Sequence, residues 1–438
     1  MLMKTWKTGF PAIVLAGAMM LMAFAFNDSD KAATTKVKFE RPKGCVYRTL
    51  FGEESSDAHA IYKTPEKVQV AVDRGQEWVA RAQQTNGGWG AGSHHRQQIM
   101  DPHAVPADPA TTAMVAMALL RSGNTLTEGA YARHLERGLN YLLMAVETAP
   151  DQAQNITTET NTQIQTKLGQ NIDVILAAQF LTIMLDHLDH ETSLKKRTQA
   201  ALDICIEKIQ GAQNADGSIR GDGWAGVLQS SLANNALEMA EAKGANVDKK
   251  ALERSREYQK GNYDASTGAV NTDRGAGVLL YAVSGSTRAS AKEARKVKEA
   301  MNEARRKGEL PPDAAPTPEN LEVIGYSPSD AKKYATAYAI YESAKEQAQR
   351  DDVMDGFGSN GGEEFLSYLQ TGESMIINKD QEWKSWYDNI SGRILKIQNN
   401  DGSWNGHHCI TSPVFCTATC LLILSVNNDI GNLTEIGR

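Results

Sequence analysis

Two segments of the chain, RGQEWVARAQQTNGGWG at residues 74–90 and GRILKIQNNDGSWNG at residues 392–406, share the pattern Q-x-x-x-G-x-W. A third copy, KIQGAQNADGSIRG at residues 208–221, has isoleucine in place of the tryptophan. In each copy an amphipathic run ends in glutamine and is followed by Asn-Gly or Asp-Gly, which favour turns because they tolerate positive φ. A more apolar run then begins. Recurring units of this kind indicate a repeat architecture of helix pairs.

The helices predicted before and after each turn differ in where their apolar residues lie. The first helix of a pair carries charge on one face, as in residues 65–84, and is typical of a surface helix. The second helix is apolar nearly all round, as in residues 173–185, and is typical of a buried helix. About six pairs are expected from this periodicity, with the fifth the weakest. Outer runs start near 66, 127, 194, 248, 288 and 380, and inner runs near 110, 172, 225, 273, 330 (with 361–370 as the alternative) and 412.

The first and last copies have the best-formed motifs, unlike the degenerate caps that terminate an open solenoid. A ring removes the bare hydrophobic ends that a solenoid has to cap. The sequence therefore predicts an all-α fold over residues 65–430, a closed double ring with inner helices around a central cavity. Residues 26–64 read as an irregular N-terminal arm.

The N-terminus has the features of a secretory signal. Lys4 and Lys7 precede the uncharged apolar run 9–26, and small residues lie at a cleavage point after Ala25. We expect residues 1–25 to be a signal peptide and the protein to be secreted or periplasmic. The alternative is an uncleaved anchor, which is the only membrane association expected. The net charge is −7 without a basic patch, so no nucleic-acid partner is expected.

Histidines follow the tryptophan of the repeat in both its first and last copies. His94 and His95 follow the first, and His407 and His408 follow the last. If the ring closes, these copies are neighbours and their imidazoles gather at one rim of the cavity, near the N-termini of inner helices. The residues assigned to a ligand site at this rim are His94, His95, His103 and Asp108.

A metal site at the same rim is predicted from His407, His408 and Cys416, because imidazole and thiolate ligands suit zinc. Two alternatives stay open. The loops can simply line a wet cavity mouth, or Cys409 and Cys416 can form a disulfide, which an oxidising compartment permits and which removes both thiols as ligands. The chain has five cysteines, so at least one thiol is left over in any intrachain pairing.

Three carboxylates at the starts of inner helices are candidates for general acid or base chemistry: Asp173, Glu363 and Glu364. The structural alternative is that these side chains only cap their helices or interact favourably with the helix dipole.

The first repeat resembles the QW repeat of class II terpene cyclases, and the last resembles the repeats of protein prenyltransferase β subunits. The residues that carry the first resemblance are Arg74, Gly75, Trp78, Val79, Gln83, Gly87 and Trp89. The resemblance implies an (α/α)6 toroid with its site in the central cavity. The D-x-D-D acid of the cyclases does not occur in the sequence. Cys416 stands where the prenyltransferases place a zinc-binding histidine, and Glu363 and Glu364 stand near their Asp-x-Cys position.

The expected function is that of a secreted or periplasmic member of this superfamily. It would bind a small-molecule or lipid-like ligand, apolar or amphipathic, with metal-assisted chemistry at the histidine-rich mouth. One alternative is a polysaccharide lyase-type α/α barrel enzyme, which needs a Tyr or His base near a cation. The other is a non-catalytic secreted ligand carrier, similar in architecture to cobalamin carriers.

Overall fold

The computed structural model describes residues 62–188, 192–221, 223–356 and 361–437. They form sixteen α-helices and one short antiparallel strand pair, so the predicted helical class is confirmed. All of them belong to one unit that spans Val46–Arg438. The predicted signal peptide at 1–25 lies outside the described residues, as does the predicted arm at 26–64 except for its last three residues.

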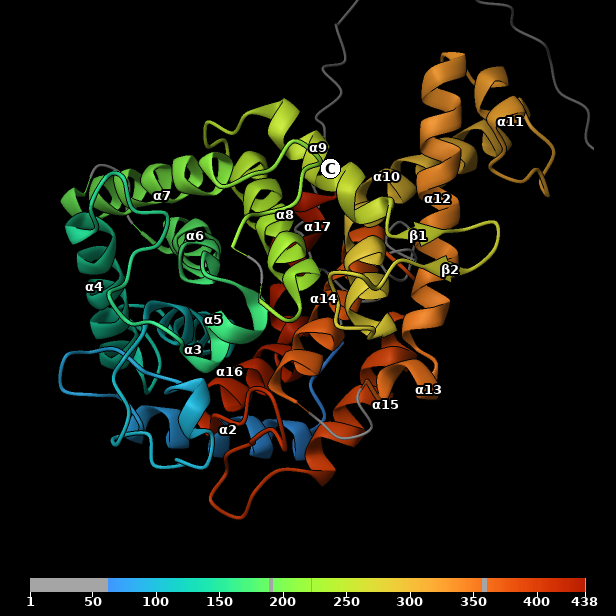
Figure 1. The fold of residues 1–438 in the computed structure, drawn as a ribbon. Coiled ribbons are helices and arrows are strands. Elements are labelled where there is room, and N and C mark those ends of the chain that lie inside the picture. The colour runs from blue at the N-terminus through green and yellow to red at the C-terminus, as the bar shows by residue number, and fades with distance from the viewer. Residues whose placement is uncertain (1–61, 189–191, 222, 357–360, 438) are drawn as a thin grey trace, which may run out of the picture. The chain divides into compact units, whose positions relative to one another are not determined.

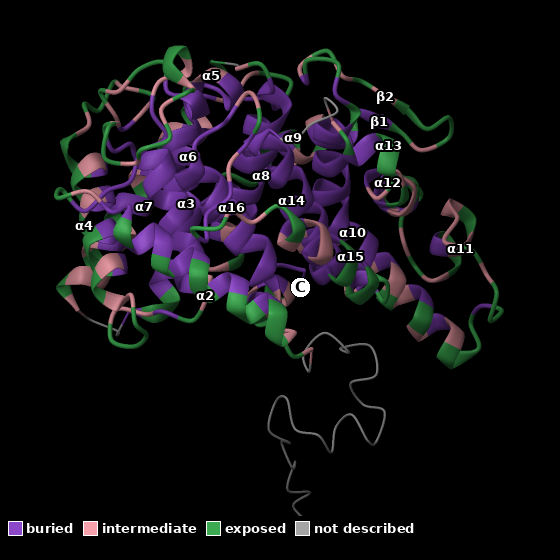
Figure 2. Ribbon diagram, turned by 90° about the horizontal axis from the view of Figure 1, so that it is seen from below, coloured by how far each residue is buried: buried purple, intermediate pink, exposed green. Residues whose placement is uncertain are grey.

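Six helices, which we call the inner helices, supply most of the core (Figure 2). They pack in the order α3, α6, α8, α10, α14, α16, and α16 packs in turn against α3, so the contacts return to their starting point. Their bounds are α3 (Pro109–Arg121), α6 (Ile172–Met184), α8 (Gly226–Ala242), α10 (Leu279–Lys307), α14 (Gly362–Asn378) and α16 (Pro413–Leu424).

Six further helices lie outside these and bury one side each. Five of them pack against the inner helix that precedes them in the chain, as α4 does on α3 and α15 on α14. The first, α2, instead packs against α16, beside which it lies in Figure 1. The outer helices are α2 (Glu66–Arg81), α4 (Ala132–Thr148), α7 (Ser193–Gly211), α9 (Lys249–Lys260), α12 (Pro328–Ala348) and α15 (Trp383–Lys396).

Short elements connect these helices. The hairpin β1 (Tyr263–Asp264) and β2 (Ala269–Val270) lies between α9 and α10, and α17 packs against α8 and α14. Among the described residues no single helix has the length and hydropathy to cross a membrane, and one bent pair, Pro413–Leu424 with Val426–Ile436, reaches that level by length and composition only. The remaining elements are α5 (Gln163–Leu168), α11 (Pro318–Val323), α13 (Asp351–Met354), α17 (Ile430–Ile436), η2 (His94–Arg96), η3 (Leu185–His187) and η4 (Val426–Asp429).

The fifth helix pair differs from the sequence prediction. The outer run expected near 288 is the continuation of α10, a single helix of 29 residues. The run expected near 330 as an inner helix is the outer helix α12, and the inner position belongs to α14, the alternative at 361–370. The charged half of α10 extends past the inner core, because with α11 and α12 it has a small core of its own around Val297, Met301 and Leu321.

The glutamine of each repeat joins its own turn to the next outer helix. Gln83 Nε2 donates to Gly87 O (2.8 Å) and to His134 O in α4 (2.9 Å). Gln213 Nε2 donates in the same way to a carbonyl in α9 (2.8 Å), and Gln398 Nε2 to a carbonyl in α2 (3.0 Å). Each earlier repeat thus contacts the outer helix that follows it in the chain. The last repeat makes the same contact with the first outer helix.

The tryptophans of the repeats fill the space beneath this contact. Trp89 and Trp404 are fully buried, and each indole N–H donates to a carbonyl of the outer helix that precedes it, at 2.7 and 2.9 Å. The neighbouring outer helix presents a glycine to each ring. A Cβ on Gly138 would lie 2.9 Å from Trp89, and one on Gly75 would lie 3.0 Å from Trp404. Both glycines are therefore required by packing, not by backbone conformation.

Replacing Gln398 with alanine tests the closing contact. The substitution leaves the carbonyls of Ala71 and Gly402 without this donor, so we expect the free energy of unfolding to fall by about 1–3 kcal/mol. Urea unfolding of the purified chain measures the change. The matched control is Gln381→Ala, an exposed glutamine two residues before α15, which we expect to change stability by no more than about 0.5 kcal/mol. Equal, small effects of the two substitutions would contradict a closing role for Gln398.

Candidate functional site

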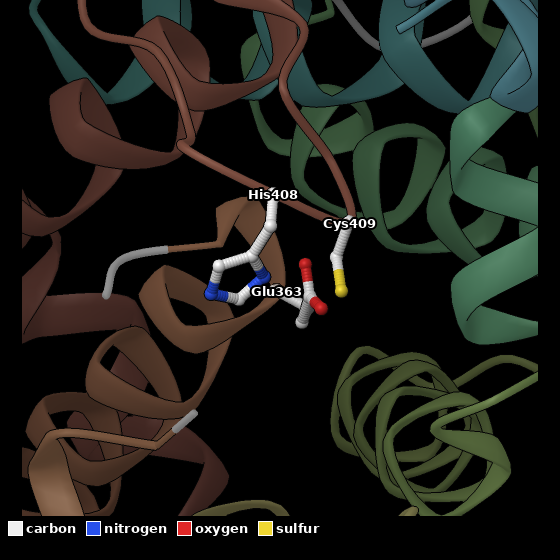
Figure 3. A group of neighbouring side chains, drawn as sticks. All are labelled: Glu363, His408 and Cys409. Atoms are coloured by element: carbon white, nitrogen blue, oxygen red, sulfur yellow. The ribbon is translucent and has the colours of Figure 1, made fainter. Parts of the chain in front are cut away.

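Three potential metal ligands meet at the N-terminal end of α14. Glu363 lies in the first turn of this helix, and His408 and Cys409 lie in the loop that leads into α16 (Figure 3). A carboxylate oxygen, an imidazole nitrogen and the thiol sulfur of these residues all lie within 4.8 Å of one another. Glu363 is buried, while His408 and Cys409 are half-buried. The three side chains therefore form a compact, partly accessible cluster.

The loop before α16 is held on α14 by backbone pairing. Gly361 pairs with His408 as an isolated parallel bridge, and Gly362 N donates to Ile410 O at 3.0 Å. Gly362 permits this approach, because a Cβ there would lie 2.8 Å from Ile410 O. Cys409 has a φ of +61°, in the left-handed region that non-glycine residues seldom adopt. The pairing thus fixes the backbone next to both candidate ligands.

Two adjacent carboxylates share one tyrosine hydroxyl. The Tyr281 hydroxyl, on α10, lies 3.5 Å from Glu363 Oε1 and 3.4 Å from Glu364 Oε1. Backbone N–H groups hold the other oxygens: Ile410 N donates to Glu363 Oε2 (3.3 Å), and Gly361 N donates to Glu364 Oε2 (2.6 Å). Burial, and then the two carboxylates, raise the pKa of Tyr281 far above its usual value. Tyr281 therefore stays protonated and acts as a hydrogen-bond donor.

The Cys409 thiol lies between an anion and a cation. Burial, followed by the Glu363 carboxylate, raises the pKa of Cys409 to about 12, while Lys167 opposes this shift. Lys167 comes from α5 and is only 4% exposed. With these neighbours alone the thiol is protonated at neutral pH, so it becomes a thiolate only if additional positive charge is placed beside it.

The first and last repeats meet at this loop, as predicted, but only part of the predicted histidine set does. His94 Nδ1 lies 2.6 Å from Gln97 Nε2, which also donates to Cys409 O at 3.0 Å. Burial, and then Lys167, lower the pKa of His94. His95 is exposed, and so is His103, whose Nε2 lies 3.1 Å from a backbone carbonyl of α2.

The predicted metal ligands His407 and Cys416 are not part of the cluster. His407 is exposed, one residue away from the half-buried His408. Cys416 is buried in the first turn of α16, where its thiol donates to Ile410 O at 3.5 Å and burial raises its pKa. The Cys409–Cys416 pair of the alternative disulfide is not joined in this structure, where both cysteines have free thiols and the Cys409 thiol lies at Glu363.

Asp108 and Asp173 are held at helix starts. Asp108 caps α3 and accepts hydrogen bonds from Thr111 N (2.7 Å) and Ala91 N (2.9 Å), although burial raises its pKa. Asp173 lies in the first turn of α6 and accepts Ile156 N at 2.8 Å, with Oδ1 lacking a partner among the described residues. Burial raises the pKa of Asp173 to about 7. These contacts fit the structural alternative for both, namely that they hold helix starts and adjoining loops.

Three residues of the site were not predicted from the sequence as a metal ligand, a base or a cation. They are Lys167, Tyr281 and Cys409. Tyr281 is one polar group in the apolar first turns of α10, and Lys167 lies in a six-residue helix inside a polar segment. No local pattern separates either from a core tyrosine or a surface lysine. Only the packing of α5 and α10 beside α14 brings them together.

Two other polar clusters are made of mutually paired charges. A cavity of about 780 Å³ between α10, α12 and the start of α15 is lined by Lys345 and Asp380, which pair at 2.8 Å. Glu253, Glu257 and Glu293 form a second acidic group, but Lys260 and Lys333 pair with them. Both clusters are therefore accounted for as ion-pair networks.

The high pKa of Asp173 predicts a specific pH dependence of stability. Between its unfolded value of 3.8 and about 7, the folded chain keeps a proton that the unfolded chain has lost. The stabilising effect of this proton is complete below the unfolded pKa and is lost as the pH rises through the folded pKa. In Asp173→Asn this decline is removed, so from pH 4 to pH 8 the variant should lose about 4 kcal/mol less stability than the parent.

Urea unfolding at the two pH values measures this difference. Asp203→Asn, which removes an exposed carboxylate on α7, is the matched control and should keep the pH profile of the parent. If Asp173→Asn also keeps the parent profile, Asp173 does not retain a proton in the folded state.

No family model matches the sequence, and no curated protein matches it. A solved structure of a glycosidase is similar, with 12% sequence identity, a TM-score of 0.43, and coverage of 83% of this chain and 97% of the glycosidase chain. The chain is thus a helical protein with distant structural similarity to a glycosidase.

Proposed function

We propose that this protein is an (α/α)6 toroid, secreted or periplasmic, that binds one zinc ion with Glu363, His408 and Cys409 and acts on a ligand at this rim. The cyclic order of the inner helices and the contact of α2 with α16 support the toroid. The single observation that carries the function is the meeting of a carboxylate, an imidazole and a thiol within 4.8 Å.

The donor set suits zinc in chemistry and in number. Catalytic zinc sites use three protein ligands and leave a fourth position for water or substrate. Zinc–ligand bonds of about 2.0–2.3 Å place tetrahedral donors roughly 3.3–3.8 Å apart, so small rotations of the three side chains would complete the site. The charge also fits, because a cation beside Glu363 supplies what the Cys409 thiol needs to lose its proton. The mixed carboxylate, imidazole and thiolate set disfavours calcium and magnesium, which take oxygen ligands.

When bound, zinc would supply Lewis-acid activation of a water or carbonyl at its open position. The protein's own groups around it have separate tasks. Ile410 N orients the Glu363 carboxylate, and Gly361 N orients that of Glu364. Tyr281 lies between both carboxylates and stays protonated, so its hydroxyl can donate a hydrogen bond to a developing oxyanion. The cluster thus combines an electrophile site with an adjacent hydrogen-bond donor.

A second candidate is a polysaccharide lyase-type enzyme. Such an enzyme needs a Tyr or His base near a cation, and this candidate is supported by Tyr281 at Glu363, His408 in the same cluster, and Lys167 beside the Cys409 thiol. The raised pKa of Tyr281 argues against it as the base, which leaves His408 for that role. A non-catalytic carrier would share the ligand site without turnover.

We expect the purified chain to bind one zinc ion. The substitutions Glu363→Gln, His408→Ala and Cys409→Ser should each weaken zinc binding by about 100-fold or more, because changing even the residues behind metal ligands lowers metal affinity about 10–100-fold. Competition against a chromophoric chelator measures the affinity. Cobalt substitution adds an independent readout, because a thiolate-to-cobalt absorption band should appear in the parent and disappear in Cys409→Ser.

The matched control is His407→Ala, which removes the exposed imidazole next to His408 and should bind zinc like the parent. Circular dichroism of each variant shows whether the helices are retained. Zinc binding that survives Cys409→Ser, or that is lost in His407→Ala, would overturn the proposed ligand set. Zinc binding without any turnover of glycosidic or uronate substrates would favour the carrier.

A further inference from the structure

Lys167 is a buried ammonium without a carboxylate partner. The residue is 4% exposed, and among the described residues it forms no ion pair within 4.0 Å. Its neighbours are the indole ring of Trp224, whose centroid lies 3.8 Å from Nζ, and the thiol of Cys409. Burying a charge is unfavourable unless it is paired, and neither an aromatic ring nor a neutral thiol compensates for a carboxylate.

Backbone contacts fix the loop that carries Trp224 against the backbone of Lys167. Ala225 N donates to Lys167 O at 2.7 Å, and Trp224 N donates to Thr166 O at 3.1 Å. Gly223 lies so close that a Cβ there would be 2.6 Å from the Lys167 carbonyl carbon. The loop before α8 is therefore fixed on α5, with Trp224 over the ammonium. Lys167 is held at the cluster and not left to swing into solvent.

Trp224 itself is 59% exposed, which is unusual for the largest apolar side chain. One part of the indole shields Lys167, and the remainder faces outward at the rim where the inner helices begin. An exposed aromatic surface next to a buried cation matches a ligand in which a ring and an anionic group are neighbours.

The side chains below the cluster are polar, which bears on the ligand class. Gln370, two turns into α14 from Glu363, lies against Ser231 on α8, and Asn235 Nδ2 donates to Gln370 Oε1 at 3.3 Å. Gln370 Nε2, Asn235 Oδ1 and Ser367 Oγ are buried and have no partner among the described residues. Amides and hydroxyls in these positions suit a polar ligand and do not form the aromatic lining that an isoprenoid chain would need.

We infer that Lys167 is the anion-binding residue of the ligand site, and that the ligand is a ring-bearing carboxylate whose carboxylate pairs with Lys167 while its ring contacts Trp224. This inference rests on the proposed function in placing the ligand beside Glu363, His408 and Cys409. The ring can belong to a uronate sugar or to an aromatic acid, because both place a carboxylate next to a ring face that can pack on an indole.

Isothermal titration calorimetry of the zinc-loaded parent with two matched pairs of probes tests this inference. The pairs are glucuronate with glucose, and benzoate with benzyl alcohol. In at least one pair the carboxylate should bind about tenfold or more tightly than its neutral partner, since hydrogen bonds to charged groups contribute more than neutral ones. The pair that shows the difference identifies the ring. In Lys167→Met the difference should disappear, and added salt should weaken binding of the carboxylate only.

Lys250→Met, which removes an exposed lysine on α9, is the control and should keep the parent's preference. Lys167→Arg, which retains the charge, should keep part of it. If Lys167→Met instead binds both members of a pair like the parent, or if neither carboxylate binds better than its partner, the inference is overturned.

Zinc affinity is measured in the same variants. Loss of zinc binding in Lys167→Met with an unchanged carboxylate preference would make Lys167 a residue that serves the Cys409 thiolate only. A Lys167-dependent preference without zinc binding would leave this inference standing and remove the proposed metal.

Discussion

The arrangement of this protein depends on the hydrogen bonds of one amide side chain, repeated along the chain. The repeat glutamine ends an outer helix, satisfies the carbonyl of the following turn, and reaches a carbonyl in the next outer helix. Carbonyls left unpaired at helix ends need such partners, and a side-chain amide provides them without requiring a particular neighbouring sequence. Because Gln398 makes this contact to α2, the two ends of the helical array are joined by the same bond that joins its interior members.

That closure decides what is possible at the rim. Gln97, in the loop after the first turn, contacts both His94 and the backbone of Cys409, which are more than 300 residues apart in sequence. The α14 N-terminus then adds Glu363 and Glu364, α10 adds Tyr281 and α5 adds Lys167. These groups come from several different helix pairs. The chemistry of the cluster is therefore a property of the assembled helices.

The sequence predicted the helical class and the meeting of the first and last repeats, because both follow from periodicity and from turn chemistry. It also placed Glu363, Glu364 and His408 among the candidates. It could not choose between two neighbours in sequence with equal chemistry: His407 and His408 cannot be distinguished without knowing which one the pairing with Gly361 turns toward Glu363. Cys416 was favoured over Cys409 through the family resemblance, yet the first turn of α16 buries it. Lys167 and Tyr281 could not be found, since their role arises only from the contact between separate helices.

The long helix α10 contributes to two separate apolar cores. Its first half lies in the inner core, whereas its second half packs with α11 and α12 around a small apolar cluster of its own. A core of that size stabilises its surroundings far less than the main one, so we expect amide hydrogens in the distal part to exchange through openings that leave the rest intact. Two apolar cores thus share one continuous helix, and we expect a probe placed in its distal half to report a different opening from a probe at the rim that holds Glu363.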